Sequence, residues 1–490
     1  MKRLLGLCVS VALAWDSCAQ SADDVQQMRA LIEAQNKTIE ALSARVSALE
    51  AEKAKPAVEP SATLPASPAS GAAGTAATAG PPKTDKIPLN ASWSGKDGLT
   101  FESEAKGADK KPLYQVKIGG RFQTDFAWFE NSEDFDIIGA FYPQYGLNHE
   151  QDGTEIRRAR LHMIGKLGTH LSFKAEYDFA ANSPGDDAGK VQDVFVSYDG
   201  IPYVGSVRLG HFKEPLGLEE VQTDNATSFM ETSLIRSFLP GRNVGIMASN
   251  APFKGRMSWA AGVFRETDNW PSDNDSDDDR GWQVTGRVTG TPWYQDGGRR
   301  MFHLGVSGTH RNLDGPGRFR AKPEANLANF YADTGSFRID TADAIGLEAS
   351  MNVGPWWAQG EYVYNVADAF EIGNVGFNAY YFQTGWIISG EHRPYKTSDG
   401  TFDIIIPRRP LHWGGGERGF GAWEIAARYS HLDLDDGFIR GGRLTDYTLG
   451  LHWYPTANTR VMLDYVHSDV ENDLYEGGVD ILQTRFQLHF

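Results

Sequence analysis

Alternation of apolar and polar residues begins at Tyr114 and recurs through the rest of the chain. In YQVKIGGRFQTDFAW (114–128), one parity carries Val, Ile, Phe and Trp, and the other carries Gln, Lys, Arg and Asp. A period of two predicts a β-strand. The segment has about 14 residues, enough for a tilted strand that crosses a membrane, whereas strands of soluble proteins average about 5–6. The pattern therefore favours a membrane barrel over a soluble sandwich.

Sixteen segments of this kind can be counted. They lie near 115–128, 155–167, 171–180, 191–199, 205–212, 243–250, 256–264, 282–290, 301–310, 344–353, 356–365, 379–390, 420–432, 444–454, 459–468 and 480–490. An even count is typical of bacterial outer-membrane barrels, and sixteen strands leave an aqueous channel. We predict an all-β fold, a transmembrane antiparallel β-barrel of about 16 strands, over residues 111–490.

The connections between these segments differ in length. Those at 168–170, 200–204, 251–255, 291–300, 354–355 and 455–458 are short, and those at 129–154, 213–242, 265–281 and 311–343 are long. Segment 213–242 lacks alternation, and long segments without secondary structure tend to be functional, so we predict that it folds into the lumen. Segment 391–419 is long but falls on the side of the short turns. Either the strand count slips there, or this segment also folds inward.

The N-terminus has the features of a secretory signal, residues 1–19. Lys2 and Arg3 precede a short apolar stretch, and small residues favour cleavage near Ala19. A lipoprotein anchor at Cys18 is the alternative. Because both cysteines would leave with the signal, neither a disulfide nor a cysteine metal site is predicted.

Residues 20–53 are predicted to form a coiled-coil helix, followed by a Pro/Ala/Gly-rich linker over 54–110. Apolar residues at alternating spacings of three and four run from Val25 to Leu49, which indicates a heptad seam. A helix docked on its own domain is the alternative. The linker composition cannot bury a core, although a short strand is expected near Leu99–Glu102.

No enzyme motif is present, so no catalytic residue, cofactor or metal ligand is predicted. The Asp-rich segment 268–279 invites a calcium site, but it lacks the Gly and Glu that an EF-hand loop needs. We interpret it as a solvated loop. The net charge of −17 argues against nucleic acid as a partner.

Strand parity predicts which basic side chains face the lumen. A charge on the lipid side costs about 2–4 kcal/mol at mid-membrane, so strand arginines should face inward. This places Arg121, Arg158, Arg160, Arg208, Arg256, Arg287, Arg428, Arg460 and Arg485 in the lumen. Arg157 falls at a strand position whose side chain would face lipid, so it must lie at a rim or a bulge. Guanidinium groups in a wet pore would favour oxyanions. The alternative is simple neutralisation, because Asp125, Glu176, Asp178, Glu348, Glu361, Glu424 and Asp464 have the same inward parity.

Several stretches resemble one family, the phosphate-selective porin O and P family. They are IGGRFQTD, EIRRARL, VRLGHFKEPLGLEEVQTDNATSFMETSLI with LPGRNVGI, GAWEIAARYSHLDL and GLHWYPTANTRVMLDYVHSDV, within residues 113–490. The resemblance implies trimeric sixteen-stranded porins whose inward segments narrow an anion-conducting pore. It matches Arg121, Arg157 and Arg158 to wall arginines and Lys213 to a constriction lysine. The chain departs from the family motifs at His211 and Thr232.

Together these patterns predict a passive outer-membrane porin for phosphate or other small anions. The expected partners are outer-membrane lipid, small anions and two further copies of the chain in a homotrimer. The alternative is a weakly selective porin whose coiled coil, at residues 24–50 in the periplasm, tethers the outer membrane to a periplasmic or cell-wall partner.

Overall fold

The computed structural model describes residues 88–94, 98–107, 110–132, 152–180, 189–267, 281–412, 419–473 and 475–490. The chain divides into two compact units, residues 1–84 and 85–490, and every described residue belongs to the second. The predicted signal, the predicted coiled-coil helix and the Asp-rich segment 268–279 therefore lie outside the described residues. Within the described ranges, no helix is long and apolar enough to cross a membrane.

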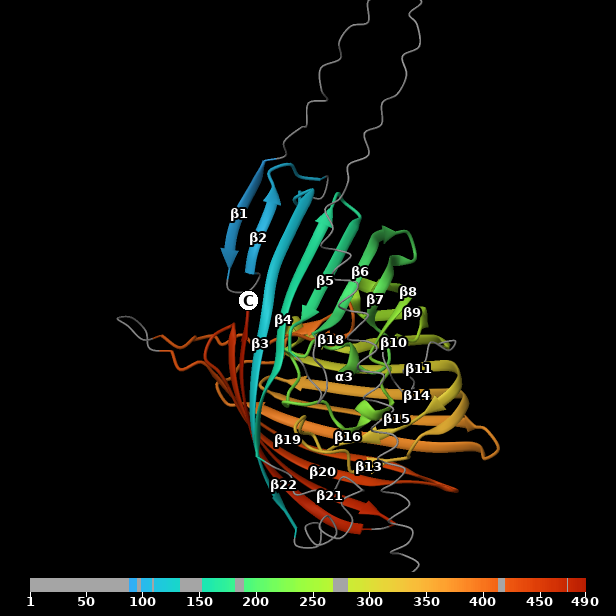
Figure 1. The fold of residues 1–490 in the computed structure, drawn as a ribbon. Helices are drawn as coiled ribbons and strands as arrows, with labels where there is room; N and C mark the ends of the chain where they lie inside the picture. The colour runs from blue at the N-terminus through green and yellow to red at the C-terminus, as the bar shows by residue number, and fades with distance from the viewer. Residues whose placement is uncertain are drawn as a thin grey trace, which may run out of the picture. The chain divides into compact units, whose positions relative to one another are not determined.

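Sixteen strands of the described chain close into one antiparallel barrel (Figure 1). They are β3 (Tyr114–Asn131), β4 (Gly153–Leu167), β5 (Leu171–Asp178), β6 (Lys190–Ile201), β7 (Gly205–Lys213), β8 (Arg242–Asn250), β9 (Met257–Arg265), β10 (Trp282–Gln295), β11 (Arg300–Gly317), β14 (Phe337–Val353), β15 (Trp356–Ala369), β16 (Gly373–Ile387), β19 (Ala422–Asp436), β20 (Ile439–Tyr454), β21 (Thr459–Asn472) and β22 (Tyr475–His489). Each pairs with the next in this order, and β22 pairs back with β3. All sixteen predicted segments are confirmed, although β14 and β16 begin earlier than the sequence pattern indicated.

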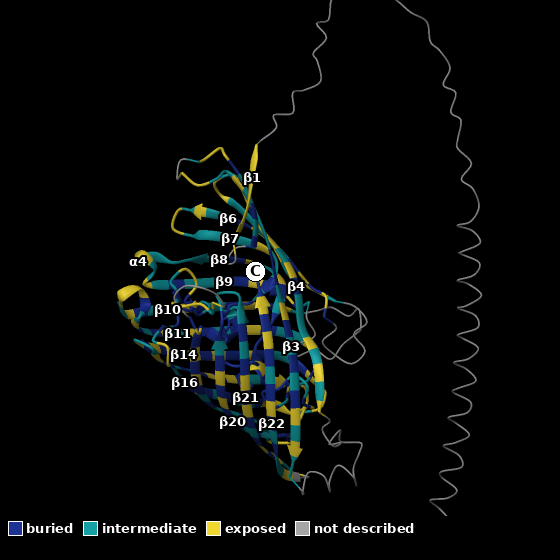
Figure 2. Ribbon diagram, turned by 90° about the vertical axis from the view of Figure 1, so that its left-hand side faces the viewer, coloured by how far each residue is buried: buried dark blue, intermediate teal, exposed yellow. Residues whose placement is uncertain are grey.

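Side chains alternate between the two faces of the wall, as the colours along β20, β21 and β22 show in Figure 2. On β20, the exposed Tyr447, Leu449 and Leu451 alternate with the buried Thr448 and His452. The outward face is largely apolar and the inward face is largely polar. An exposed apolar surface of this extent is stable only against an apolar environment such as lipid.

The register of β3 and β4 places Arg157 at a β-bulge. Gln123 pairs with Arg158 and Thr124 pairs with Ile156, so Arg157 is the extra residue on β4. A bulged residue leaves the two-residue alternation. The Arg157 side chain is only 13% exposed, and it forms an ion pair with Glu231. Of the two predicted positions for Arg157, rim or bulge, the structure has the bulge.

Two further strands extend the sheet beyond the C-terminal end of β22. They are β1 (Leu89–Ser94) and β2 (Gly98–Ser103), and β2 pairs with β3 from Leu99–Ile118 to Glu102–Gln115. Figure 1 shows both strands in blue beside β3. The expected short strand near Leu99–Glu102 is confirmed. The predicted linker to residue 110 is too long, because residues 89–103 form this hairpin.

Three connections turn inward and contact the lumen face of the wall. The first, residues 214–241, contains α3 (Leu218–Val221) and η2 (Leu234–Phe238). The second, residues 318–336, contains β12 (Arg320–Ala321) and β13 (Ala332–Asp333). The third, residues 391–405, contains β17 (Tyr395–Lys396) and β18 (Thr401–Phe402).

The first inward segment is attached through its backbone. Glu361 on β15 accepts hydrogen bonds from the Leu218 and Glu219 N–H groups at 2.7 and 2.8 Å. Asp464 on β21 accepts the Met230 N–H at 2.9 Å, and the Ser430 hydroxyl accepts the Leu234 N–H at 3.0 Å. These wall side chains satisfy buried backbone groups that regular structure would otherwise pair. The prediction that segment 213–242 folds into the lumen is confirmed.

Wall residues hold the other two inward segments as well. Asp446 on β20 accepts the Glu324 N–H at 3.0 Å, so residues 318–336, within the long connection 311–343, contact the lumen face. Arg287 on β10 donates to the carbonyls of Asp399 and Gly400 at 2.7 and 2.9 Å. The strand count therefore does not slip at 391–419, and residues 391–405 of that connection fold inward.

Candidate functional site

A polar cavity of about 470 Å³ lies between the wall and the first two inward segments. Its wall side is formed mainly by β4 and the facing ends of β7 and β8, and its other sides by residues of 219–237 and 318–330. Nine basic side chains line it: Arg157, Arg158, Arg160, Lys213, Arg236, Arg242, Arg318, Arg320 and Lys322. Five acidic side chains line it as well: Glu219, Glu220, Asp224, Glu231 and Glu324. The excess of basic groups favours an anion in this cavity.

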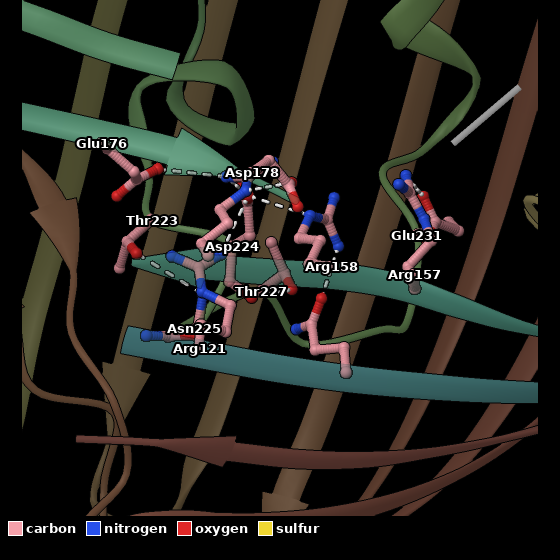
Figure 3. Close-up of polar contacts among 12 residues, drawn as sticks. Arg121, Arg157, Arg158, Glu176, Asp178, Thr223, Asp224, Asn225, Thr227 and Glu231 are labelled. Carbon is pink, nitrogen blue, oxygen red and sulfur yellow. Dashed lines mark hydrogen bonds and ion pairs between the residues drawn. The ribbon is translucent and has the colours of Figure 1, made fainter. Parts of the chain in front are cut away.

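Four cations converge on the carboxylate of Asp224, in the first inward segment. Its Oδ2 atom lies 3.0 Å from an Arg121 nitrogen, 3.0 Å from an Arg160 nitrogen and 3.3 Å from Nε of Arg158. Its Oδ1 atom lies 3.3 Å from Nζ of Lys213. Figure 3 shows Asp224 in the middle of this group, with Arg121 and Arg158 approaching it from the wall.

Strand geometry explains why these cations meet. Arg121 and Arg160 pair directly across β3 and β4, so their side chains stand side by side on the lumen face. Arg158 lies two residues along β4 with the same parity, and its guanidinium donates to the side-chain amide oxygen of Gln123 at 2.8 Å. Lys213 ends β7, and its ammonium also donates to the carbonyls of Glu220 and Gln222 at 2.7 and 3.2 Å. Lys213 thus holds the turn that carries Asp224.

Glu231, seven residues further along the same segment, forms a second ion-pair group. Arg157 donates to both of its carboxylate oxygens at 2.8 and 2.9 Å. Arg485 on β22 contacts Glu231 at 2.6 Å and also contacts Asp125 on β3 at 2.6 Å. In Figure 3, Arg158 lies between Asp224 and the Arg157–Glu231 pair. Bidentate guanidinium–carboxylate pairs are geometrically specific, so Glu231 fixes the position of this part of the segment.

The surroundings of Asp224 and Glu231 favour their ionised forms. Burial raises the pKa of Asp224, but Lys213 and the surrounding arginines outweigh burial and hold that pKa well below its usual range. Burial likewise raises the pKa of Glu231, and Arg157 and Arg485 together lower it well below the usual range. The wall arginines are therefore partly neutralised by acids that the inward segment supplies.

Other arginines predicted to line the pathway lie elsewhere. Arg287 is buried and pairs with Glu348 at 2.7 Å, and Arg428 is buried and pairs with Glu324. Arg208 lies over the Phe195 ring, 4.0 Å from its centroid. None of these three lines the cavity. For Arg287 and Arg428, the neutralisation that the sequence left open as an alternative is what the structure contains.

Arg256 is a correction to the predicted set. It precedes the first residue of β9, so strand parity does not apply to it. Its side chain is exposed, and it donates to the carbonyl of Tyr294 at 3.1 Å in the neighbouring turn. Arg256 therefore supports a turn at the barrel end and does not line the cavity.

Sequence reasoning missed the groups that the inward segments contribute. Asp224, Glu231, Arg236, Arg320 and Lys322 lie outside the strands, where no periodicity indicates which way a side chain points. Arg320 is exposed, and its guanidinium lies 4.2 Å from the centroid of the Phe330 ring. The one available signal was the position of 213–242 between two strands. It indicated an inward segment without specifying its contacts.

Comparison with known proteins assigns the chain to a family. Porin O of Pseudomonas aeruginosa is 24% identical over 425 residues, which cover 78% of this chain and 90% of that protein. An uncharacterized protein of Caulobacter vibrioides is 27% identical over 481 residues, 94% of this chain and 88% of that one. Among solved structures, the anion-selective porin from Comamonas acidovorans matches with 16% identity and a TM-score of 0.46, over 77% of this chain and all of that one. The family model for phosphate-selective porin O and P matches residues 116–490, and the chain therefore belongs to that family.

Proposed function

We propose that this outer-membrane porin is a passive channel that prefers small anions, with phosphate as the candidate solute. Its family and barrel fold indicate a channel rather than an enzyme. The observation that carries the preference is the cavity between the wall and the inward segments, where nine basic side chains face five acidic ones. Fixed positive charge in a narrow wet passage concentrates anions and repels cations.

The type of basic group supports oxyanions over halides. Arg157, Arg158 and Arg160 present guanidinium groups from one strand. A guanidinium stays charged at any physiological pH and offers planar donors that match a phosphate or carboxylate edge. Contacts of this kind are weak enough, when partly satisfied by protein acids, to let an ion leave as well as enter.

The reversal potential of the purified protein in a planar bilayer under a KCl gradient tests the preference. We expect the sign of an anion-selective pore, and partial block of the chloride current by added phosphate. Arg158→Gln should reduce both effects, because it removes a charge from the cavity. Arg256→Gln is the matched control, since Arg256 lies at the barrel end and should leave both unchanged. A cation-selective wild-type current would contradict the proposal.

The homotrimer is proposed on the geometry of one side of the wall. Strands β5, β7, β8 and β9 have eight or nine residues, whereas every barrel strand from β10 to β22 has at least 14. Eight or nine residues are at the lower limit for spanning a bilayer. On this side Val196, Leu209, Ile246 and Val263 form an exposed row of directly paired residues. An exposed apolar row on the side of the barrel with the shortest strands suits contact with a second copy of the chain.

A tether is the second candidate function, and it rests on the heptad pattern of residues 24–50. In this proposal, the 20–53 segment follows a signal removed at residue 19 and binds a periplasmic or cell-wall partner. Deletion of residues 24–84, which precede β1, separates the two functions. A pure channel should conduct unchanged after the deletion. A tether should lose its association with the cell envelope fraction that contains the wall polymer.

A further inference from the structure

The side chain of Asp224 has the surroundings of a bound oxyanion. Its two carboxylate oxygens lie within 3.0–3.3 Å of three guanidinium groups and one ammonium group. Among the described residues, Arg121, Arg158 and Lys213 have no other carboxylate within ion-pair distance. Only Arg160 shares its charge with further acids, Asp178 and Glu176. One carboxylate therefore faces a surplus of positive charge.

Hydrogen-bond donors remain unused around this carboxylate. The Nε atom of Arg121 is buried and has no hydrogen-bond partner in the described part of the chain. The Nε atom of Arg158 lies 3.3 Å from Oδ2 of Asp224 as an ion pair, but it is not aligned for a hydrogen bond. A buried donor without a partner costs free energy, and a carboxylate has only two oxygens to offer. A tetrahedral oxyanion with three or four oxygens and a second negative charge would satisfy more of these donors.

Asp224 is placed so that it can leave this position. It lies in a turn within the inward segment rather than on the wall, between the Thr223 carbonyl and the Ala226 N–H that close the turn at 2.8 Å. Its side chain borders the 470 Å³ cavity together with Arg158, Arg160 and Lys213. A change of side-chain rotamer would expose the basic group to an ion in the cavity without moving a strand.

We infer that Asp224 is a tethered counter-anion that occupies an oxyanion site, and that a permeating dianion of the phosphate or sulfate class binds there by displacing it. This inference rests on the proposed anion pathway and names the site and the ligand class within it. An ion with a single charge gains less from the four cations than the attached carboxylate does. Asp224 thus disfavours monoanions and keeps the affinity for dianions low enough for release.

A tethered competitor has a predictable effect on affinity. The apparent affinity of a ligand falls by the fraction of time during which its site is free. If Asp224 leaves the site free for about one-tenth of the time, its removal should tighten phosphate binding about tenfold. Asp224→Asn removes the charge and keeps the size of the side chain, so it is the appropriate change.

The test is block of the chloride current by inorganic phosphate at pH 7, with the full-length protein in a planar bilayer. Asp224→Asn should lower the phosphate concentration for half-block about tenfold and raise the permeability of chloride relative to potassium. Asp296→Asn is the matched control. It removes the same type of charge, but Asp296 lies in the turn between β10 and β11, outside the cavity, and pairs with the exposed Arg300 at 2.8 Å. The control should leave the half-block concentration unchanged.

Two results would overturn the inference. One is an equal change, or no change, in Asp224→Asn and Asp296→Asn. The other is failure of Asp224→Asn to give the folded, heat-modifiable barrel while Asp224→Glu folds, because the carboxylate would then be a structural requirement. The proposed function fails separately, through a wild-type protein without anion preference. An anion-selective wild type whose phosphate block is unaffected by Asp224→Asn contradicts this inference alone.

Discussion

Replacement of Glu361 by glutamine tests how the 214–241 segment is held inside the barrel. The carboxylate of Glu361 accepts the N–H groups of Leu218 and Glu219 at 2.7 and 2.8 Å, and the Tyr381 hydroxyl at 2.7 Å. A glutamine side chain keeps one oxygen acceptor and presents an NH₂ donor in place of the other. One of the two buried N–H groups therefore loses its acceptor and faces another donor.

The free-energy cost of Glu361→Gln follows from that lost hydrogen bond. An unpaired buried donor costs about 1–3 kcal/mol. With a loss of about 2 kcal/mol, and a factor of ten for each 1.4 kcal/mol, the detached population of this end of the segment rises roughly 30-fold. The attachments at Met230 and Leu234 do not involve Glu361, so the barrel and the far end of the segment should stay in place.

Single-channel recording in a planar bilayer measures the consequence. Glu361→Gln should show a higher mean conductance and more open-channel noise than the wild type, with the same heat-modifiable mobility on gels. Tyr381→Phe is the control, because it removes the hydroxyl donor and leaves both backbone hydrogen bonds. If Glu361→Gln and the wild type have the same conductance and noise, Glu361 does not hold the segment. Equal effects in the two variants would assign the change to the tyrosine contact instead.

Three further outcomes are expected. Arg485→Met leaves the buried Asp125 without its partner, which should destabilise the barrel by about 3–5 kcal/mol and lower its urea midpoint; an unchanged midpoint would contradict this. The pKa of Glu231 is depressed in the folded state, so its ion pairs stabilise the fold above the unfolded pKa and are lost as the pH falls through the folded pKa. The urea midpoint of the wild type should therefore exceed that of Glu231→Gln near neutral pH, and the difference should narrow progressively as the pH falls below about 4. Leu209→Cys should cross-link copies of the chain with a short bis-maleimide, whereas Ile425→Cys on the opposite side should not; equal cross-linking would exclude the proposed subunit contact.

The strands were predictable because each of their faces meets a different environment. Along β20, an apolar side chain at every second position faces outward, and the intervening residues face the lumen. The need for an apolar outward side chain at every second position is local in sequence, so alternation alone located all sixteen barrel strands. At the starts of β14 and β16 the exposed positions carry polar side chains, such as Arg338 and Asn374, so the alternation is weaker there. The first residues of β14 and β16 were missed for that reason, and the hairpin β1–β2 was predicted only in part.

The candidate site was predictable only in part. Parity placed Arg121, Arg158 and Arg160 on the lumen face, and the exclusion of charge from lipid required a bulge or rim for Arg157. Parity failed at Arg256, which lies one residue before its strand. It also says nothing about whether an inward arginine is free or paired. That depends on the acids of segments that have no period.

By itself, the sequence determined the strands, their order, the direction of their side chains and the location of the segments too long to be turns. The reason is that these properties follow from a two-residue repeat and from the cost of charge in lipid. The tertiary structure alone decided that Asp224 lies among four cations, that Glu231 joins Arg157 to Arg485, and that residues 318–336 complete the cavity. These contacts join residues up to 254 positions apart. They are set by how irregular segments pack inside a closed barrel, which no local pattern encodes.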